Sequence, residues 1–283
     1  MNHDKRHQLS LILLVSPLAI WLVVFLCLPL LMVSIFSFFQ RGPYGNIIFE
    51  LSLQNYARLF DPLYLQIFMK SVAFSVVTTI CCLFIGFPMA FAIATSKPAL
   101  RQWLFLALMI PFLTNFIVRV YAIRVLLSAE GPLNALLLSI GLLAVPVSLN
   151  DSLVSVTLGM ITNYLPFMVL PLYVTLEKFD FSLLEAGSDL GATWPQLFKK
   201  IILPLSIPGI LSGSLLVALP VLGEFIIPDL LGGAKYMLVG NLIADQFLKA
   251  RDWPFGSALS MFLMTVVFFG VFLQYVLKRR SIA

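Results

Sequence analysis

Charged residues are scarce in this sequence. Asp, Glu, Lys and Arg make up 11% of its 283 residues, whereas they make up about 25% of an ordinary soluble domain. Hydrophobic residues account for 60% of the chain, and its mean hydropathy is +1.01. A soluble globule of this size could not cover its surface with so few charges, and a disordered chain would hold far fewer apolar residues. The composition excludes both classes and predicts an all-α integral membrane protein with several spans.

Histidine and cysteine are also rare, which excludes several kinds of catalytic site. The two histidines, His3 and His7, lie in the N-terminal segment, so neither an HExxH zinc site nor a Ser-His-Asp triad can form inside the fold. Cys27, Cys81 and Cys82 lie in apolar runs, where cysteine is expected as a small buried hydrophobe. The chain also lacks a nucleotide-binding P-loop pattern. We therefore expect no catalytic residue, no metal, no bound cofactor and no enzyme activity of this chain's own.

Apolar runs long enough to cross a membrane occur six times, since a transmembrane helix needs about 20 predominantly apolar residues. The expected spans are 11–38, 70–95, 103–124, 152–176, 206–228 and 256–277. The first run is too long for a signal peptide and has no small-residue cleavage site after it, so we expect it to be a retained anchor. With six spans, both termini lie on the same side of the membrane.

The distribution of basic residues predicts that both termini are cytoplasmic. With the termini inside, 10 basic residues fall in 51 cytoplasmic positions, whereas 5 fall in 85 external positions. The side richer in Lys and Arg is the cytoplasmic one. The net charge of +5 then belongs to membrane-flanking loops, and no nucleic-acid partner is expected. The cytoplasmic segments are 1–10, 96–102, 178–205 and 278–283. The external segments are 39–69, 125–151 and 229–255.

The cytoplasmic segment 178–205 contains two helix-start patterns. Ser182-x-x-Glu185 matches a capping box, in which the serine side chain accepts from a backbone amide and the glutamate reaches back to the serine N–H. Thr193-x-x-Gln196 matches a second capping box. The pattern predicts two short helices exposed to the cytoplasm. The alternative is a solvated linker, but two caps in succession favour an ordered docking element.

A glycine turn is predicted between these two helices. Gly191 stands where the first helix should end, in a position suited to a left-handed C-cap. Lys199 and Lys200 are expected near the end of the second helix, where they would complement its negative pole. A run of small residues in the first helix would let another protein approach closely. This run comprises Glu185, Ala186, Gly187 and Ser188.

The spacing of the loop resembles the EAA motif found in permease subunits of type I ABC importers. Glu185-Ala186-Gly187 is followed by Gly191 and then by Ile201-x-Leu203-Pro204, and Gly187 replaces the alanine of the family pattern. In that family the loop forms coupling helices that sit in a groove on the ATPase subunit. The resemblance therefore assigns coupling to the ATPase to Glu185, Ala186, Gly187, Asp189, Gly191, Ile201, Leu203 and Pro204.

Other short motifs resemble the spermidine/putrescine permeases, and in particular the first of their two permease subunits. They include Asn55-Tyr56-x-Arg58-Leu59, Ile110-Pro111-Phe112, Leu165-Pro166-Phe167-Met168, Leu231-Gly232-Gly233 and Arg251-Asp252-Trp253-Pro254. The resemblance implies a type I ABC importer permease fold over 67–277. An N-terminal anchor helix and first external loop in 1–66 would precede it, and a basic cytoplasmic tail in 278–283 would follow it.

The resemblance also implies a function and a set of partners. The chain would translocate polyamines across the bacterial inner membrane, surrounded by membrane lipid and paired with a second, similar permease. Two copies of an ABC ATPase would carry ATP and Mg, and a periplasmic polyamine-binding protein would deliver the solute. Close relatives carry other solutes, so a permease for iron, phosphonate or thiamine is the alternative. A membrane scaffold would not need the EAA spacing.

Polar residues inside apolar spans are candidates for a substrate path, because placing them in a membrane is costly. Glu224 lies late in the fifth expected span, where a carboxylate could replace the water around a polyamine ammonium. Its alternative role is a salt bridge to Arg119 or Arg124. The further candidates are Asp229, Asn115, Tyr121 and Tyr164. For the last three, the alternative role is hydrogen bonding between helices.

Two local patterns complete the expectations. Segment 131–144 is apolar but too short to span the membrane, so it predicts an interfacial or re-entrant helix. Gly209-x-x-x-Gly213 predicts a place where two helices pack closely.

Overall fold

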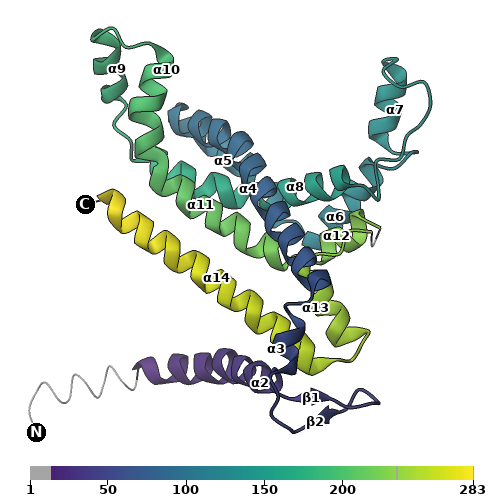
Figure 1. Cartoon of the computed structure of the whole chain (residues 1–283). Helices are drawn as coiled ribbons and strands as arrows, with labels where there is room; N and C mark the ends of the chain where they lie inside the picture. Colours follow the sequence, from purple (N-terminus) through teal and green to yellow (C-terminus); the bar gives the residue numbers. More distant parts are fainter. Residues whose placement is uncertain (1–13, 234, 283) are drawn as a thin grey trace, which may run out of the picture. The chain divides into compact units, whose positions relative to one another are not determined.

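The computed structural model describes residues 14–233 and 235–282, with side chains described up to residue 272 (Figure 1). Predictions that rest on His3, His7 and the rest of 1–10, or on the side chains of the tail 278–283, lie outside the described residues. The chain forms two compact units. Unit 1 comprises Met1–Leu65 and Leu242–Val266, and unit 2 comprises Gln66–Asn241 and Val267–Ala283.

Unit 1 begins with an apolar helix over Leu14–Phe36. The π turn η1 (Val23–Cys27) lies inside this helix, and the Leu28 N–H donates to the carbonyl of Val23, five residues back. Pro29, two residues after the π turn, has no N–H to continue the regular α ladder. A second π turn, in unit 2, also ends two residues before a proline, Pro204. The remaining elements of the unit are α2 (Leu28–Phe36), β1 (Gln40–Arg41), β2 (Ile47–Ile48), α3 (Gln54–Arg58) and parts of α4 (Pro62–Thr95), α13 (Val239–Leu248) and α14 (Trp253–Ile282).

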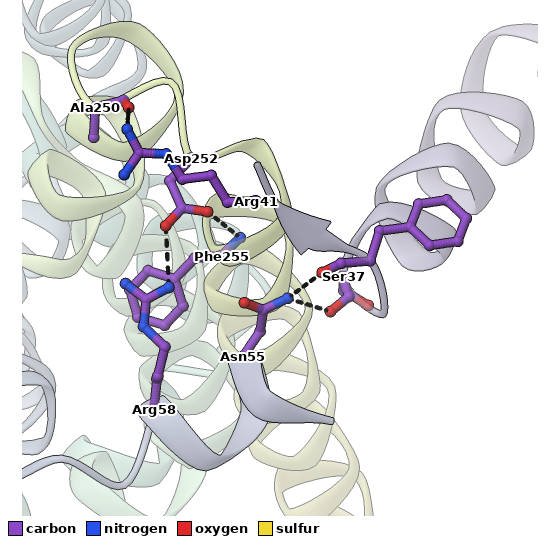
Figure 2. Close-up of polar contacts among 8 residues, drawn as sticks. Ser37, Arg41, Asn55, Arg58, Ala250, Asp252 and Phe255 are labelled. Carbon is purple, nitrogen blue, oxygen red and sulfur yellow. Dashed lines mark hydrogen bonds and ion pairs between the residues drawn. The ribbon is translucent and has the colours of Figure 1, made fainter. Parts of the chain in front are cut away.

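Polar contacts within unit 1 connect the segment that follows α2 to the residues just before α14 (Figure 2). The buried Asn55 side chain donates to the carbonyls of Ser37 (3.1 Å) and Phe39 (2.7 Å), which fixes α3 against the chain leaving α2. Arg41 donates to the carbonyl of Ala250 at 2.7 Å. These bonds satisfy backbone carbonyls that the irregular loops would otherwise leave without partners.

An ion pair continues this network. Arg58 Nη1 lies 3.0 Å from Asp252 Oδ2, and the guanidinium lies 3.9 Å from the centroid of the Phe255 ring (Figure 2). Asp252 Oδ1 also accepts from the Phe255 N–H at 3.1 Å, so the carboxylate caps the start of α14. The short hairpin of β1 and β2, with Gln40 opposite Ile48, lies in the same unit.

Unit 2 is built around α8 (Leu153–Glu177), whose inward side chains are fully buried. α11 (Leu203–Gly223) packs along α8, and the two lie side by side in Figure 1. A Cβ on Gly213 would lie 2.8 Å from Met168 Sδ, and one on Gly209 would lie 2.7 Å from Thr175 Oγ1. The close approach predicted from these two glycines is confirmed. The buried α8 side chains are Val156, Met160, Met168, Val169, Leu172 and Leu176.

The third expected span, 103–124, is not one straight helix. It consists of α5 (Pro98–Leu113) and α6 (Phe116–Leu126), which are bent by 94°. Thr114 is extended, and the Asn115 side chain caps α6 by accepting from Ile117 N–H at 2.9 Å. Among the described residues, 5 helices are long and apolar enough to cross a membrane, or up to 6 if the bent pair is one span.

Other expectations are confirmed or corrected by the helix bounds. The apolar segment 131–144 contains α7 (Pro132–Ser139), which confirms a short helix there. The fifth span starts earlier than expected, because the helix runs without a break over Trp194–Gly223, and it ends before Glu224. The prediction of three buried cysteines is wrong for Cys27, which is exposed; Cys82 is buried. The remaining elements of unit 2 are α9 (Ser182–Asp189), α10 (Trp194–Leu197), η2 (Phe198–Ile202) and α12 (Ile226–Leu231).

Candidate functional site

The first helix of the cytoplasmic loop, α9, starts with a different cap from the one predicted. Ser182 lies inside the helix and Phe181 precedes it, so the Ser182–Glu185 capping box is wrong. Asp180 Oδ1 accepts from the Ser182 N–H at 3.0 Å instead. Hydrogen bonds from the Ser182 side chain and backbone hold the pKa of Asp180 below its usual value. Asp180 is an alternative acceptor two residues before this amide, and a carboxylate there also suits the positive end of the helix.

The glycine turn after α9 is confirmed. Gly191 has a φ of +80°, a conformation that glycine adopts without strain. The Ala192 N–H donates to the Gly187 carbonyl at 3.0 Å, and the Gly191 N–H donates to the Ser188 carbonyl at 2.9 Å. These two bonds form a Schellman motif, which ends the helix and fixes the direction of the chain.

The second helix of the loop is the beginning of a membrane span. The predicted start at Thr193 is confirmed, since the Gln196 side chain accepts from the Thr193 N–H at 2.9 Å. The helix then continues through α10 and η2 into α11. Lys199 and Lys200 therefore lie inside a continuous helix, and the prediction that they lie at a helix end is wrong. The end of the loop and the fifth span are therefore parts of one helix, which contains a π turn at Phe198–Ile202.

Gly187 faces its own chain rather than an empty docking surface. A Cβ at this position would lie 2.6 Å from Leu197 Cδ2 and 3.3 Å from Ile201 Cδ1. The glycine therefore lets α9 pack against the helix that follows it. The exposed surface of α9 is formed instead by Glu185, Ala186, Ser188 and Asp189. Leu203 and Pro204 are exposed at the start of α11, and Ile201 is half-buried.

Apolar residues of the loop were missed by the sequence analysis. Leu190 is 89% exposed at the end of α9, and Leu183, about two helical turns before it, is also exposed. A leucine so exposed beside a Schellman turn is available to a partner protein. The signal in the sequence is their spacing, which puts Leu183, Ala186 and Leu190 on one side of a helix.

Aromatic contacts connect the loop to the end of α4. The ring of Phe91 lies 6.4 Å from that of Phe181 and 6.1 Å from that of Trp194. Phe87, one turn earlier on α4, packs edge-on against Phe198 at 5.6 Å. Such edge-to-face pairs favour a defined geometry. The loop is thereby fixed both to α4 and, through the continuous helix, to α11.

Glu224 is a buried carboxylate at the other end of that continuous helix. It is 8% exposed and follows the last residue of α11. Its Oε1 accepts from the N–H groups of Ile226 (2.8 Å) and Ile227 (3.3 Å), which begin α12. Its Oε2 accepts from the hydroxyl of Tyr164 on α8. The carboxylate thus joins three helices by replacing its water with protein donors.

The alternative role of Glu224, an ion pair with arginine, is wrong for the described part of the chain. Arg124 donates to the carbonyl of Leu230 instead. The Arg119 guanidinium lies 5.9 Å from the Phe112 ring centroid, and its Nε is buried without a hydrogen-bond partner among the described residues.

The other candidates for a substrate path are divided by the structure. Tyr164 is in contact with Glu224. Asp229 lies on α12, where its Oδ1 accepts from Asn241 at 2.7 Å, and Asn241 also donates to the Phe225 carbonyl. Asn115 caps α6 rather than bonding another helix, and Tyr121 is half exposed on the same helix. Asn241, which sequence reasoning missed, therefore links the two carboxylate-bearing segments.

Comparisons with known proteins identify the family. The model of the binding-protein-dependent transport system inner membrane component family matches residues 83–282. The spermidine/putrescine transport system permease protein PotB of Haemophilus influenzae is 43% identical over 255 residues, which covers 90% of this chain and 89% of that protein. The protein of the same name from Salmonella typhimurium strain SL1344 is 44% identical over 266 residues, covering 94% and 91%.

A solved structure has the same fold. The bacterial alginate ABC transporter in complex with an alginate pentasaccharide-bound periplasmic protein contains a chain that matches with a TM-score of 0.74 and 18% identity, covering 98% of this chain and 96% of that chain. At that identity the likeness concerns the fold alone. The family match extends over more than half of the chain, and the relatives align over nearly all of it. This chain belongs to the family of binding-protein-dependent transport system inner membrane components, and it is a multi-pass inner-membrane transport subunit rather than an enzyme.

Proposed function

We propose that this chain is the permease subunit of an ATP-driven ABC importer for polyamines of the spermidine and putrescine class. The observation that carries the proposal is identity of 43% and 44% with two spermidine/putrescine permeases, each aligned over about nine-tenths of both proteins. Its partners are a second, similar permease and two copies of an ATPase that binds ATP and Mg. A periplasmic polyamine-binding protein delivers the solute.

Coupling to the ATPase is assigned to α9 and the start of the helix that follows. Glu185 and Asp189 are exposed on α9, and Leu190 offers an exposed apolar side chain beside them. Closure of an ATPase dimer moves α9, which packs against Leu197 and Ile201. The movement then passes along the continuous helix Trp194–Gly223 and, through the aromatic contacts, to α4.

The carboxylate of Glu224 lies at the far end of the helix that would carry this movement. It is the residue directly after α11, and its hydrogen bonds join α11 to α8 and α12. A shift of α11 would break or strengthen these bonds, which gives two states that differ in access to the carboxylate. A polyamine ammonium would then bind Glu224 through a charge-assisted hydrogen bond. Asp229 on α12 supplies a second carboxylate near the external end.

Transport by the assembled complex tests the proposed solute. The chain is purified with its partner permease, ATPase and binding protein and placed in lipid vesicles. Binding protein loaded with spermidine or putrescine should stimulate ATP hydrolysis and drive uptake of the labelled polyamine. The polyamine assignment would be contradicted if iron, phosphonate or thiamine, each with its own binding protein, stimulated ATP hydrolysis and polyamines did not. The assignment to the importer class would still hold.

A charge reversal on α9 tests the coupling assignment. Glu185→Lys should abolish stimulation of ATP hydrolysis by loaded binding protein while the complex still forms, because the exposed face of α9 then carries the wrong charge for its partner. Glu50→Lys is the matched control, since Glu50 is exposed in the external segment. Normal stimulation in Glu185→Lys would refute the assignment.

A further inference from the structure

Two cavities follow α5 and α8, one beyond the other along the helices. The first has a volume of about 320 Å³ and is lined by polar and aromatic residues where α5 begins and α8 ends. The second has a volume of about 470 Å³ and is lined almost entirely by apolar residues of α4, α5 and α8. Both volumes are in or near the range of small-molecule sites. The first is lined by Pro98, Arg101, Gln102, Phe105, Tyr173 and Glu177.

The polar cavity presents a cation and a carboxylate together. Arg101 Nη1 lies 3.4 Å from Glu177 Oε1, and the Tyr173 hydroxyl donates to the same oxygen at 2.7 Å. Arg101 Nη2 donates to the carbonyl of Ala94 at 2.9 Å. The Nε of Arg101 is buried and has no partner among the described residues. The side chains of Arg101 and Glu177 are 31% and 43% exposed, so the cavity presents a cation and a carboxylate side by side.

The depth of the polar cavity corresponds to the lipid headgroups. Lys97 and Arg101 lie in a segment that the excess of basic residues puts on the cytoplasmic side. Trp103, two residues further on, is 71% exposed, as expected of a tryptophan at the membrane interface.

The apolar cavity lies at the depth of the acyl chains. Its residues on α5 extend to Pro111, ten positions beyond Arg101. At about 1.5 Å per residue this is about 15 Å, which is half of the roughly 30 Å hydrocarbon core. The two cavities together therefore extend over one leaflet of the membrane, with the polar one at its surface.

We propose that this pair of cavities binds one zwitterionic phospholipid of the cytoplasmic leaflet, with a phosphoethanolamine headgroup. Arg101 binds the phosphate through its guanidinium, and Glu177 with Tyr173 binds the ammonium. One acyl chain occupies the apolar cavity beside Ala107 and Leu165. The paired cation and carboxylate of the wall complement the phosphate and ammonium of a zwitterionic headgroup, and this charge complementarity is the reason for choosing a phospholipid as the occupant. The proposal is independent of the solute carried.

Lipid analysis of the purified protein tests the proposal. The full chain, with the subunits that remain bound to it, is washed in mild detergent, and its phosphatidylethanolamine and phosphatidylglycerol are quantified. The wild type should retain phosphatidylethanolamine selectively. Arg101→Gln removes the headgroup contact and Ala107→Phe fills the apolar cavity, so each should reduce retention about fivefold or more. Glu177→Gln should reduce the preference for phosphatidylethanolamine over phosphatidylglycerol.

Two matched controls lie beside the tested residues. Lys97→Gln removes an exposed cation one turn before Arg101, and Leu106→Phe enlarges a residue next to Ala107; neither residue lines a cavity. Both controls should retain the lipid. The proposal would be overturned if Arg101→Gln and Ala107→Phe retained as much lipid as the wild type, or if the two controls lost as much lipid as these variants. It would also be overturned if the wild type retained phosphatidylethanolamine and phosphatidylglycerol equally. A photo-crosslinking residue at position 107 that labels another protein subunit rather than lipid would overturn it as well.

Discussion

Glu224 combines a buried position with an incompletely used hydrogen-bonding capacity. An ionised carboxylate has about four acceptor positions. The Ile226 and Ile227 amides and the Tyr164 hydroxyl occupy three of them. These bonds reduce the cost of holding a charge in a membrane protein. The fourth position has no donor among the described residues, and in the proposed mechanism a polyamine ammonium would occupy it.

Glu224→Gln should lower polyamine uptake about tenfold or more at subsaturating concentration. The amide keeps the shape of the side chain but removes the charge that binds an ammonium, and hydrogen bonds to charged groups are worth about 1.5–3 kcal/mol. The measurement is the initial rate of spermidine uptake by the assembled complex in vesicles. Asp245→Asn is the control, because Asp245 lies in unit 1 and is paired with Lys249, the residue directly after its helix. Unchanged uptake in Glu224→Gln would remove this residue from the substrate path.

The Arg58–Asp252 ion pair of unit 1 has one buried and one partly exposed partner. Asp252 is 3% exposed and Arg58 is 40% exposed at the side chain, so water screens only the arginine. Asp252 also accepts from the Phe255 N–H, and its loss leaves that amide and the Arg58 cation without their acceptor. The two truncations should therefore have unequal effects.

Asp252→Ala should lower the unfolding temperature of the purified chain by several degrees. For a chain of this size, each kcal/mol lost corresponds to about 2–4 °C. Arg58→Ala should lower it less, since its charge is partly solvated and solvent-exposed pairs contribute little. Thermal unfolding followed by tryptophan fluorescence measures both. A larger effect of Arg58→Ala than of Asp252→Ala would contradict this ranking.

At the scale of elements, α9 illustrates which local signals the sequence carries. The end of α9 was predictable because Gly191 needs a positive φ that few other residues adopt. Its start was not, because Asp180 and Ser182 both offer oxygen acceptors within reach of the first amides. The sequence pattern does not say which of two neighbouring acceptors will cap the helix.

The bend between α5 and α6 shows a different limit. Hydropathy averaged over a window does not detect Thr114 and Asn115, because apolar residues surround them. The local chemistry does contain the signal, since asparagine is a strong N-cap and Pro111 stands one turn before it. Here a capping pattern inside a span was a better guide than the length of the apolar run.

Substitutions of Gly187 test whether packing of α9 on the next helix is needed for coupling. Gly187→Ala should keep most activity, because the added Cβ would meet the end of the Leu197 side chain, which can move. Gly187→Val should separate α9 from Leu197 and Ile201 and reduce binding-protein-stimulated ATP hydrolysis severalfold. The measurement is stimulated hydrolysis relative to basal hydrolysis in the assembled complex. Equal stimulation in the two variants would contradict a role for this contact.

At the scale of the whole molecule, composition was enough to predict the class of fold, but not the contacts between distant residues. Tyr164 and Glu224 were each candidates as polar residues within apolar segments, yet they are separated by 60 positions and no local pattern pairs them. Their contact results from the packing of α11 along α8. The spacing of Gly209 and Gly213 predicted that another helix packs closely there, but it did not identify that helix as α8.

The orientation of the chain follows from the excess of basic residues on one side, and labelling can test it. After replacement of Cys27, Cys81 and Cys82, a single cysteine is introduced at an exposed position of either side. Tyr44→Cys in the external hairpin should react with a membrane-impermeant maleimide in intact cells. Lys178→Cys should react only in inverted vesicles, because it follows α8 in the cytoplasmic loop. The reverse pattern would invert the topology and would put α9 out of reach of any cytoplasmic ATPase.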